Sequence, residues 1–155
     1  MGCNCGKRKI ENSIRKMTIT DLGTGNGESL AAAMKRWPAA TFNCLGVDLD
    51  DSHRPAVTSR RVHFHCEDIT SPRMQWPRRG VYVAHGVLNL LESETAATVA
   101  RKMTELSDVA TWIRLPAAYT FSKTDWAIQE GIGERSARIE VDLIDGMIDC
   151  VVTFG

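Results

Sequence analysis

Hydrophobic and polar residues follow two spacings along this chain, and together they predict a regular succession of strands and helices. Short apolar runs, typical of strands buried on both faces of a parallel sheet, are separated by longer segments with polar faces. We expect strands over 17–22, 42–48, 61–66, 80–84 and 108–115, with residues 85–91 continuing the fourth.

Two of the longer segments carry an apolar stripe at helical spacing. The stripe of the first consists of Leu30, Ala33, Met34 and Trp37. The stripe of the second consists of Ala96, Val99, Ala100 and Met103. Pro38 ends the first helix, and Ser93 is expected to cap the second, over 92–106. Shorter helices are predicted within 51–60 and over 124–130. The alternation of strands and helices predicts an α/β, doubly wound fold.

The C-terminal part of the chain reads as a β-hairpin. Residues 138–144 and 147–154 flank Asp145-Gly146, a strong signal for a two-residue turn. The first arm alternates polar and apolar residues, as an edge strand does, whereas the second is more apolar. We therefore expect seven strands, the last two forming an antiparallel pair.

Length and composition indicate an ordinary globular protein. The chain has 155 residues, enough for one domain, and a net charge of +0, which favours no particular partner. It has no apolar run near the ~20 residues of a membrane helix and no apolar signal core, so we expect no membrane association. The odd number of cysteines favours free thiols in the cytoplasm. They are Cys3, Cys5, Cys44, Cys66 and Cys150.

Residues 1–16 are polar and basic, and we expect a flexible tail there and a folded domain over 17–155. Two other interpretations of the tail stay open. Cys3 and Cys5 could be part of a metal site, although two thiols are few for one. Acylation at Gly2-Cys3 is disfavoured because Gly6 stands where the myristoylation pattern has Ser or Thr.

A glycine-rich loop follows the first strand. Asp21 ends the strand, Gly23, Gly25 and Gly27 follow at alternate positions, and a helix begins. Glycines allow the backbone to pass close to a ligand, and the start of a helix favours an anionic group. The spacing differs from the dinucleotide pattern G-x-G-x-x-G because Glu28 stands at the third glycine, which disfavours a nicotinamide-binding oxidoreductase.

Asp48 ends the second strand about twenty residues after the glycine loop. An acid at this interval binds the ribose hydroxyls of a nucleotide in βαβ folds. A structural alternative is that Asp48 caps a following helix, and one side chain could serve both purposes.

The stretch from Asp21 to Gly27 resembles motif I of the class I S-adenosylmethionine-dependent methyltransferases, and Gly46-Val47-Asp48 resembles their second motif. The resemblance covers about residues 17–155. It implies a doubly wound, seven-stranded, mostly parallel sheet with an antiparallel C-terminal hairpin strand. It also implies S-adenosylmethionine as the cofactor.

The resemblance further implies which residues meet this cofactor. The glycine loop would hold its amino-acid end, Asp48 its ribose, and Asp68 and Ile69 its adenine. The cofactor-binding residues implied in this way are Asp21, Gly23, Thr24, Gly25, Gly27, Asp48, Leu49, Asp68, Ile69, Ala84 and His85. His85 is also the candidate catalytic base, because histidine titrates near neutrality. The alternative is that His85 only packs or orients the substrate.

No metal ligand is assigned in this domain. His63 and His65 lie two residues apart on the third strand, with Cys66 next to them. Histidines in such a bare pattern more often pack in a core or against a helix than bind metal, and we expect packing here.

The family resemblance implies methyl transfer to an oxygen or nitrogen nucleophile, and we expect a small-molecule acceptor. The Asn/Asp-Pro-Pro-Tyr/Phe motif of amino-methylating enzymes and the Pro-Cys of cytosine-carbon enzymes are both absent. Two alternatives stay open. Because the segments between strands are short, the chain could be a cofactor-binding or partner-activating subunit without its own chemistry, acting with a partner or as a homo-oligomer. Nucleic-acid methylation could use the Arg-rich region 54–79.

Overall fold

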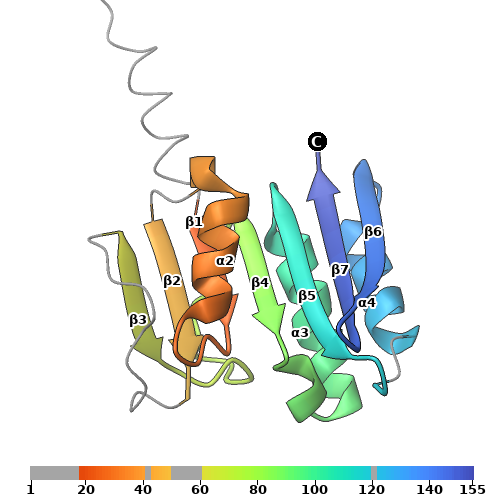
Figure 1. The fold of residues 1–155 in the computed structure, drawn as a ribbon, viewed down its shortest axis with the longest axis horizontal. Coiled ribbons are helices and arrows are strands. Elements are labelled where there is room, and N and C mark those ends of the chain that lie inside the picture. The colour runs from red at the N-terminus through yellow and green to blue at the C-terminus, as the bar shows by residue number, and fades with distance from the viewer. Residues whose placement is uncertain (1–17, 41–42, 50–60, 120–121) are drawn as a thin grey trace, which may run out of the picture.

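The computed structural model describes residues 18–40, 43–49, 61–119 and 122–155. A seven-stranded sheet in the order β3-β2-β1-β4-β5-β7-β6 runs through these residues (Figure 1). Its strands are β1 (Thr18–Leu22), β2 (Asn43–Asp48), β3 (Val62–Cys66), β4 (Val81–His85), β5 (Ala110–Pro116), β6 (Ala137–Ile144) and β7 (Met147–Phe154). The seven predicted strands, apart from the extension of the fourth, and the doubly wound fold are confirmed.

Five neighbouring strands, from β3 to β5, are parallel, whereas β7 lies antiparallel between β5 and β6. The turn between β6 and β7 contains Asp145 and Gly146, both with positive φ, so the predicted hairpin is confirmed. The parallel strands all end at the same edge of the sheet, at the bottom of Figure 1. The glycine loop and Asp48 therefore meet at that edge.

Helices cover both faces of the sheet. Helix α2 (Glu28–Arg36) lies on one face, and α3 (Ser93–Leu106) and α4 (Ser122–Ile132) lie on the other (Figure 1). The α2 side buries Leu30, Ala33 and Trp112 in one core. The α3 side buries Met103 and Ile128 among the residues of a second core. Of the predicted α2 stripe, Met34 and Trp37 are only partly buried.

Residues 86–91 do not continue β4, contrary to the prediction. Gly86 follows β4 directly with φ 68°, a left-handed conformation that ends an extended strand. The chain then forms a 3₁₀ turn, η2 (Leu88–Leu90). Another such turn, η1 (Pro38–Ala40), follows α2.

The predicted cap of α3 is wrong by one residue. Glu92 is the N-cap, Ser93 is the first helical residue, and no side chain caps the helix. Helix α4 is longer than the predicted 124–130, because it begins at Ser122 and continues through Gly131 to Ile132. A Cβ at Gly131 would lie 2.7 Å from both the Arg101 carbonyl oxygen and Thr104 Cβ. The glycine thus allows α4 to approach α3 closely.

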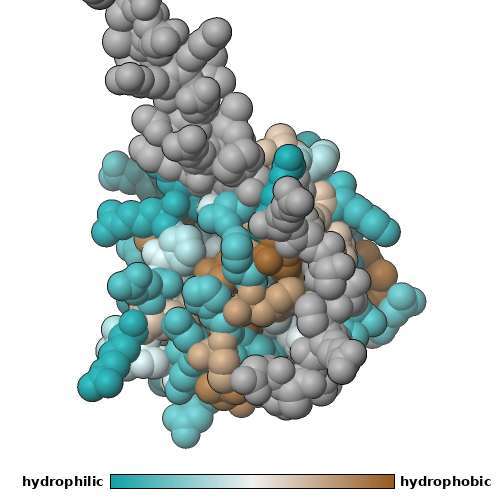
Figure 2. Space-filling view, turned by 90° about the vertical axis from the view of Figure 1, so that its left-hand side faces the viewer, coloured by the Kyte–Doolittle hydropathy of each residue, from teal (hydrophilic) through white to brown (hydrophobic). Residues whose placement is uncertain are grey.

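The edge strand β3 also differs from the prediction. His63 and His65 are exposed on it rather than packed in a core. Within the described ranges, no cluster of three potential metal ligands occurs. The helix expected in 51–60 lies outside the described residues. Viewed from the β3 side, the surface is largely polar around a smaller apolar area (Figure 2).

Candidate functional site

The glycine loop folds tightly beneath the carboxyl edge of the sheet. Gly23, Gly25 and Gly27 have φ of 67°, 55° and 93°. The Thr24 N–H donates to the Val47 carbonyl at 3.0 Å, which joins the loop to β2. A Cβ at Gly23 would lie 2.5 Å from Val87 Cγ2, so only glycine fits there. A Cβ at Gly25 would meet no protein atom within 4 Å.

Asp48 lies at the end of β2, beside this loop. Its Oδ2 accepts a hydrogen bond from the Gly25 N–H at 2.8 Å. The spacing of about twenty residues in the sequence therefore becomes a direct contact. The alternative role of Asp48 as a helix cap concerns residues outside the described ranges.

A cavity of about 290 Å³ lies on one side of the loop. It combines acidic and apolar residues: Gly23, Asp48, Leu49, Glu67, Asp68, Ile69, Gly86, Val87, Leu90 and Leu91. Asp68 Oδ1 accepts hydrogen bonds from the Thr70 hydroxyl at 2.7 Å and the Thr70 N–H at 2.8 Å, which lower the pKa of this carboxyl. A flat apolar ring with hydrogen-bond donors fits such a lining.

A second cavity, of about 310 Å³, lies on the other side of the loop. Its residues come from the loop, the start of α2, β4 and β5: Gly23, Thr24, Asn26, Glu28, Ser29, Ala32, His85 and Arg114. Gly23 lines both cavities. One elongated ligand could therefore occupy both by crossing the edge of the sheet at the first glycine.

Asp21 lies beneath the loop and lines neither cavity. It is fully buried, and its Oδ2 accepts a hydrogen bond from the Ser29 hydroxyl at 2.5 Å. Among the described residues, Asp21 Oδ1 and the Thr24 hydroxyl have no hydrogen-bond partner. Burial raises the pKa of Asp21 to about 7. Asp21 thus contacts the start of α2.

His85 ends β4 and faces Trp112, with their ring centroids 4.2 Å apart in an edge-to-face arrangement. Its Nε2 is buried and finds no hydrogen-bond partner in the part of the chain that the structure describes. Burial and then the nearby Arg114 guanidinium lower the pKa of His85 to about 4. A ring with a pKa of about 4 is neutral at pH 7.

The structure brings most of the predicted cofactor residues to the two cavities. Gly23, Asp48, Leu49, Asp68 and Ile69 line the 290 Å³ cavity, and Gly23, Thr24 and His85 line the 310 Å³ cavity. Asp21, Gly25, Gly27 and Ala84 line neither. Sequence reasoning missed Asn26, Glu28, Ser29, Ala32 and Arg114, and also Glu67, Gly86, Val87, Leu90 and Leu91. Arg114 gave a signal, because an arginine within an apolar strand is unusual.

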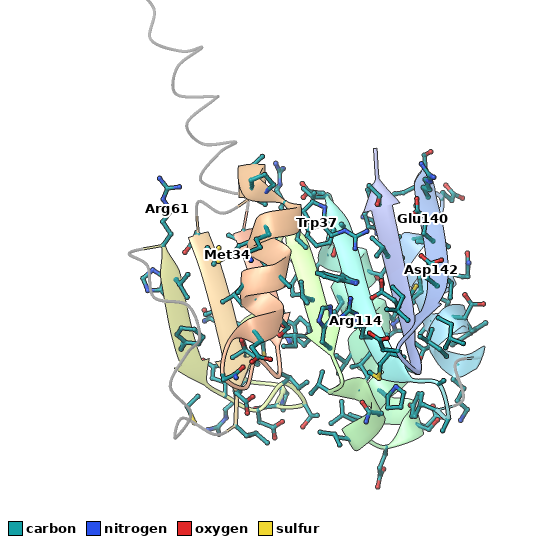
Figure 3. The ribbon with its side chains drawn as sticks, viewed as in Figure 1. Met34, Trp37, Arg61, Arg114, Glu140 and Asp142 are labelled. Carbon is teal, nitrogen blue, oxygen red and sulfur yellow. The ribbon has the colours of Figure 1, made fainter. Side chains whose placement is uncertain are left out.

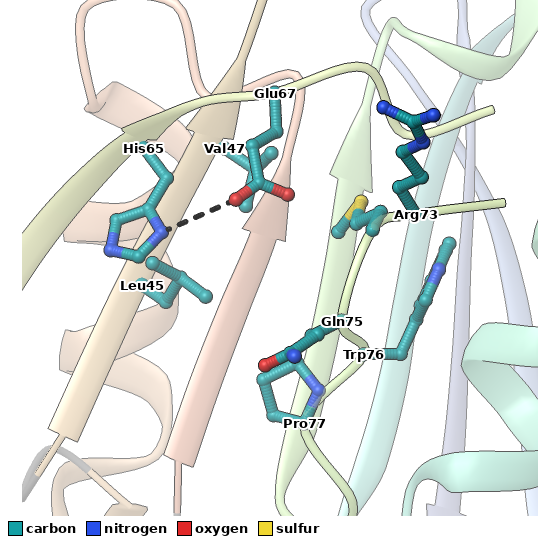
Figure 4. Close-up of a pocket in the computed structure, with 9 residues that line it drawn as sticks. Leu45, Val47, His65, Glu67, Arg73, Gln75, Trp76 and Pro77 are labelled. Atoms are coloured by element: carbon teal, nitrogen blue, oxygen red, sulfur yellow. Dashed lines mark ion pairs between the residues drawn. The ribbon is translucent and has the colours of Figure 1, made fainter. Parts of the chain in front are cut away.

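A larger cavity, of about 470 Å³, lies beside this site, on β2 (Figure 4). His65 and Glu67 line one side, with His65 Nδ1 3.7 Å from Glu67 Oε1, and Arg73 and Trp76 line the other. Residues 67–80 form neither helix nor strand, as expected for 70–79, and Ile69, Met74 and Trp76 from this segment pack against the core of the sheet. Glu67 also lines the 290 Å³ cavity, but none of the three glycines lines the larger one.

No protein-family model matches the sequence, and no curated protein matches it. Solved structures do match. An O-methyltransferase family protein from Burkholderia thailandensis is 12% identical, with a TM-score of 0.69 over 98% of this chain and 56% of that chain. An S-adenosylmethionine-dependent methyltransferase from Mesorhizobium loti is 13% identical, with a TM-score of 0.65 over 96% of each chain.

A chain from the complex that contains the Haloferax volcanii Trm112 methyltransferase activator is 10% identical, with a TM-score of 0.65. That match covers 97% of this chain and 94% of the other. The chain spans 42% and 56% of two longer solved chains that it matches. At these identities the likeness concerns the fold alone. The chain has the fold of the class I S-adenosylmethionine-dependent methyltransferases.

Proposed function

We propose that this protein binds S-adenosylmethionine and transfers its methyl group to an oxygen or nitrogen of a small-molecule acceptor. The observation that carries the proposal is the pair of cavities that meet at Gly23, with Asp48 beside them. S-adenosylmethionine has a nucleoside end and an amino-acid end, and each end needs one cavity, on opposite sides of the glycine loop.

The residues present suit the two ends of this cofactor. The apolar Ile69 and Val87 would cover the adenine, and Asp68 would accept a hydrogen bond from its amino group. Asp48 would accept hydrogen bonds from the ribose hydroxyls, as acids at this position of βαβ folds do. The loop, Thr24 and the start of α2 would surround the amino-acid end.

The cofactor supplies a methyl group on a positively charged sulfur, already activated toward a nucleophile. The protein therefore has to align the reactants and exclude water. His85 lies at the end of β4, and its side chain lines the second cavity. As a neutral ring of low basicity it would orient an acceptor by a hydrogen bond more effectively than it would remove a proton.

Calorimetric titration tests the proposal. S-adenosylmethionine and S-adenosylhomocysteine should bind, NAD should not, and Asp48→Ala should weaken both adenosyl ligands. A variant on the opposite face, Arg101→Ala, is the control because Arg101 forms only an exposed ion pair with Glu130, 3.9 Å away. Mass spectrometry of products from a metabolite panel would then identify the acceptor. Absence of binding by both adenosyl ligands would refute the proposal.

A second candidate function is a cofactor-binding subunit that needs a partner for catalysis. The 470 Å³ cavity over β2, lined by residues 73–77 of an irregular segment, favours it, as does the match to a chain solved with a methyltransferase activator. This function would be favoured over an independent enzyme if the chain binds the cofactor but shows no turnover on any acceptor alone, and if an added protein fraction restores the turnover.

Nucleic-acid methylation remains the other alternative. Arg73, Arg78 and Arg79 are exposed in the segment between β3 and β4. Binding of a labelled RNA or DNA that weakens with salt and with substitution of these arginines would favour it. We also propose a cytoplasmic location for the protein. The free thiols of Cys44, Cys66 and Cys150 agree with a reducing compartment. None of the described helices is long and apolar enough to cross a membrane.

A further inference from the structure

An arginine lies within an otherwise apolar strand on the α2 side of the sheet. Arg114 is the fifth residue of β5, whose sequence is ATWIRLP. Figure 3 shows its side chain beside β5 on the face that carries α2. The side chain is 35% exposed and lines the 310 Å³ cavity together with Gly23 and Thr24. Placing a charged side chain in this strand costs solvation, so its partners are informative.

Buried groups hold this guanidinium in one orientation. Arg114 Nε donates to Asp149 Oδ1 at 2.8 Å. The same oxygen accepts a hydrogen bond from Trp112 Nε1 at 2.6 Å, and the Asp149 side chain is only 7% exposed. The Arg114 guanidinium carbon also lies 5.1 Å from the centre of the Trp112 ring. Asp149 and Trp112 thus fix the arginine before any ligand binds.

The terminal nitrogens of Arg114 remain available. Among the described residues, only its Nε makes a hydrogen bond, so Nη1 and Nη2 have donors to offer in the cavity. The His85 side chain lines the same cavity. Glu28, an exposed acid at the start of α2, lines it too. The cavity therefore presents an acid and a preoriented guanidinium to one ligand.

We propose that Arg114 is the carboxylate-binding residue of the 310 Å³ cavity and holds the α-carboxylate at the amino-acid end of the cofactor. The inference rests on the proposed function. With the adenine beside Ile69 and Val87, the amino-acid end lies past Gly23, in the cavity that Arg114 lines. That end carries one carboxylate and one ammonium. A guanidinium binds a carboxylate through two parallel hydrogen bonds, and Glu28 offers a counter-charge for the ammonium.

Asp149 is the positioning residue in this arrangement. It does not line the cavity, but it bonds the Nε edge of Arg114 and leaves the other edge for the ligand. The cofactor would thus be recognised through its amino-acid end by β5, a strand on the far side of β4 from the glycine loop.

Two ligands with the same adenosine separate this role from others. S-adenosylhomocysteine carries the amino-acid end, whereas 5′-methylthioadenosine lacks it. Calorimetry on the full chain should show that Arg114→Ala weakens S-adenosylhomocysteine binding about 10- to 100-fold, the range for hydrogen bonds between charged groups. The affinity for 5′-methylthioadenosine should stay within about twofold of the wild type. Arg114→Lys keeps the positive charge but not the two parallel donors of the guanidinium, so it should lose less affinity for S-adenosylhomocysteine than Arg114→Ala does.

A loss of ligand affinity in these variants can be distinguished from a folding defect. Arg114→Lys keeps a cation for Asp149, so its thermal midpoint should stay near that of the wild type even if Arg114→Ala unfolds. Asp149→Asn should weaken S-adenosylhomocysteine in the same direction as Arg114→Ala but less, and Arg101→Ala should change neither affinity.

Equal loss of both ligands in the Arg114 variants, or no loss of either, would overturn the assignment while leaving the proposed function intact. Unchanged S-adenosylhomocysteine affinity with reduced turnover would place the acceptor, not the cofactor, on Arg114, and this too would overturn it. Failure of the wild type to bind either adenosyl ligand would instead refute the proposed function.

Discussion

The Gly25 N–H donates to Asp48 Oδ2 at 2.8 Å and thereby joins the glycine loop to the end of β2, 23 residues away in the sequence. The bond holds the carboxylate beside Gly23, where the two cavities meet. Asp48 thus has a structural partner in the loop before any ligand is present.

Asp48→Ala should weaken S-adenosylmethionine binding by about 1.5–3 kcal/mol, the range for a hydrogen bond to a charged group. Asp48→Asn is the matched control, because its amide oxygen can still accept from Gly25 but carries no charge for the ribose hydroxyls. It should retain the thermal midpoint and lose part of the affinity. Unchanged affinity of the Ala variant in calorimetry would show that Asp48 does not bind the ribose.

Gly23 and Gly25 should respond differently to alanine, although both have positive φ. Gly23→Ala adds a contact of 2.5 Å with Val87, so it should cost about 2–4 kcal/mol of unfolding free energy from strain and overpacking. Gly25→Ala adds no contact and should cost only about 1–2 kcal/mol for its left-handed backbone.

Urea denaturation of both variants measures the difference. Gly25→Val is a further test, because its larger side chain would extend into the space where the ligand approaches the loop. It should abolish cofactor binding while the circular dichroism spectrum stays that of the wild type. Normal binding by this variant would mean that the ligand does not approach the loop at Gly25.

The sequence predicted most of the sheet because its signals are local. The apolar runs, the Asp145-Gly146 turn and the spacing from the glycines to Asp48 each lie within one segment or one βαβ unit. The continuation of α4 through Gly131 was not predicted, because the close approach of α3 that requires a glycine there is invisible from its neighbours in sequence.

The far side of the site was missed for the same physical reason. Arg114 meets Asp149 through the register of β5 with β7, across 35 residues, and no local pattern specifies that register. The low pKa of His85 follows from burial and from the Arg114 and Arg36 guanidinium groups, which belong to two other elements. A histidine in the sequence predicts a titratable group but not the environment that shifts it.

Because of Asp21, the free energy of unfolding should fall as the pH rises. Its folded pKa of about 7 lies above the ordinary value of 3.8, because burial disfavours the charged form. The folded state therefore holds its proton more tightly than the unfolded chain between these values, and stability falls from about pH 4 to pH 7. At about 1.4 kcal/mol for each pKa unit, the loss is on the order of 4 kcal/mol.

Asp21→Asn removes this titration and can still accept a hydrogen bond from Ser29. Its urea midpoint should vary less with pH between 4 and 7, and it should exceed the wild type above pH 7. If the urea midpoint of Asp21→Asn lies below that of the wild type at every pH, the ionised carboxylate of Asp21 instead stabilises α2.

His85 should act in the opposite direction. Its folded pKa of about 4 lies below the ordinary 6.5, so the unfolded chain takes up the proton first as pH falls. The stability from the neutral ring is complete above pH 6.5 and is lost as pH falls toward 4. Besides Arg114 and Arg36, the nearby Asp149 acts on this titration and opposes the two arginines.

NMR titration of the His85 imidazole signals checks this directly, since His85 should stay neutral at pH 6. His85→Ala should lower turnover more than cofactor affinity if the neutral ring orients the acceptor. Because a ring with a pKa near 4 is already neutral at pH 6, the wild-type kcat should show no inflection from His85 between pH 6 and 8. An inflection there that His85→Ala removes would show instead that His85 titrates near neutrality and works as a base.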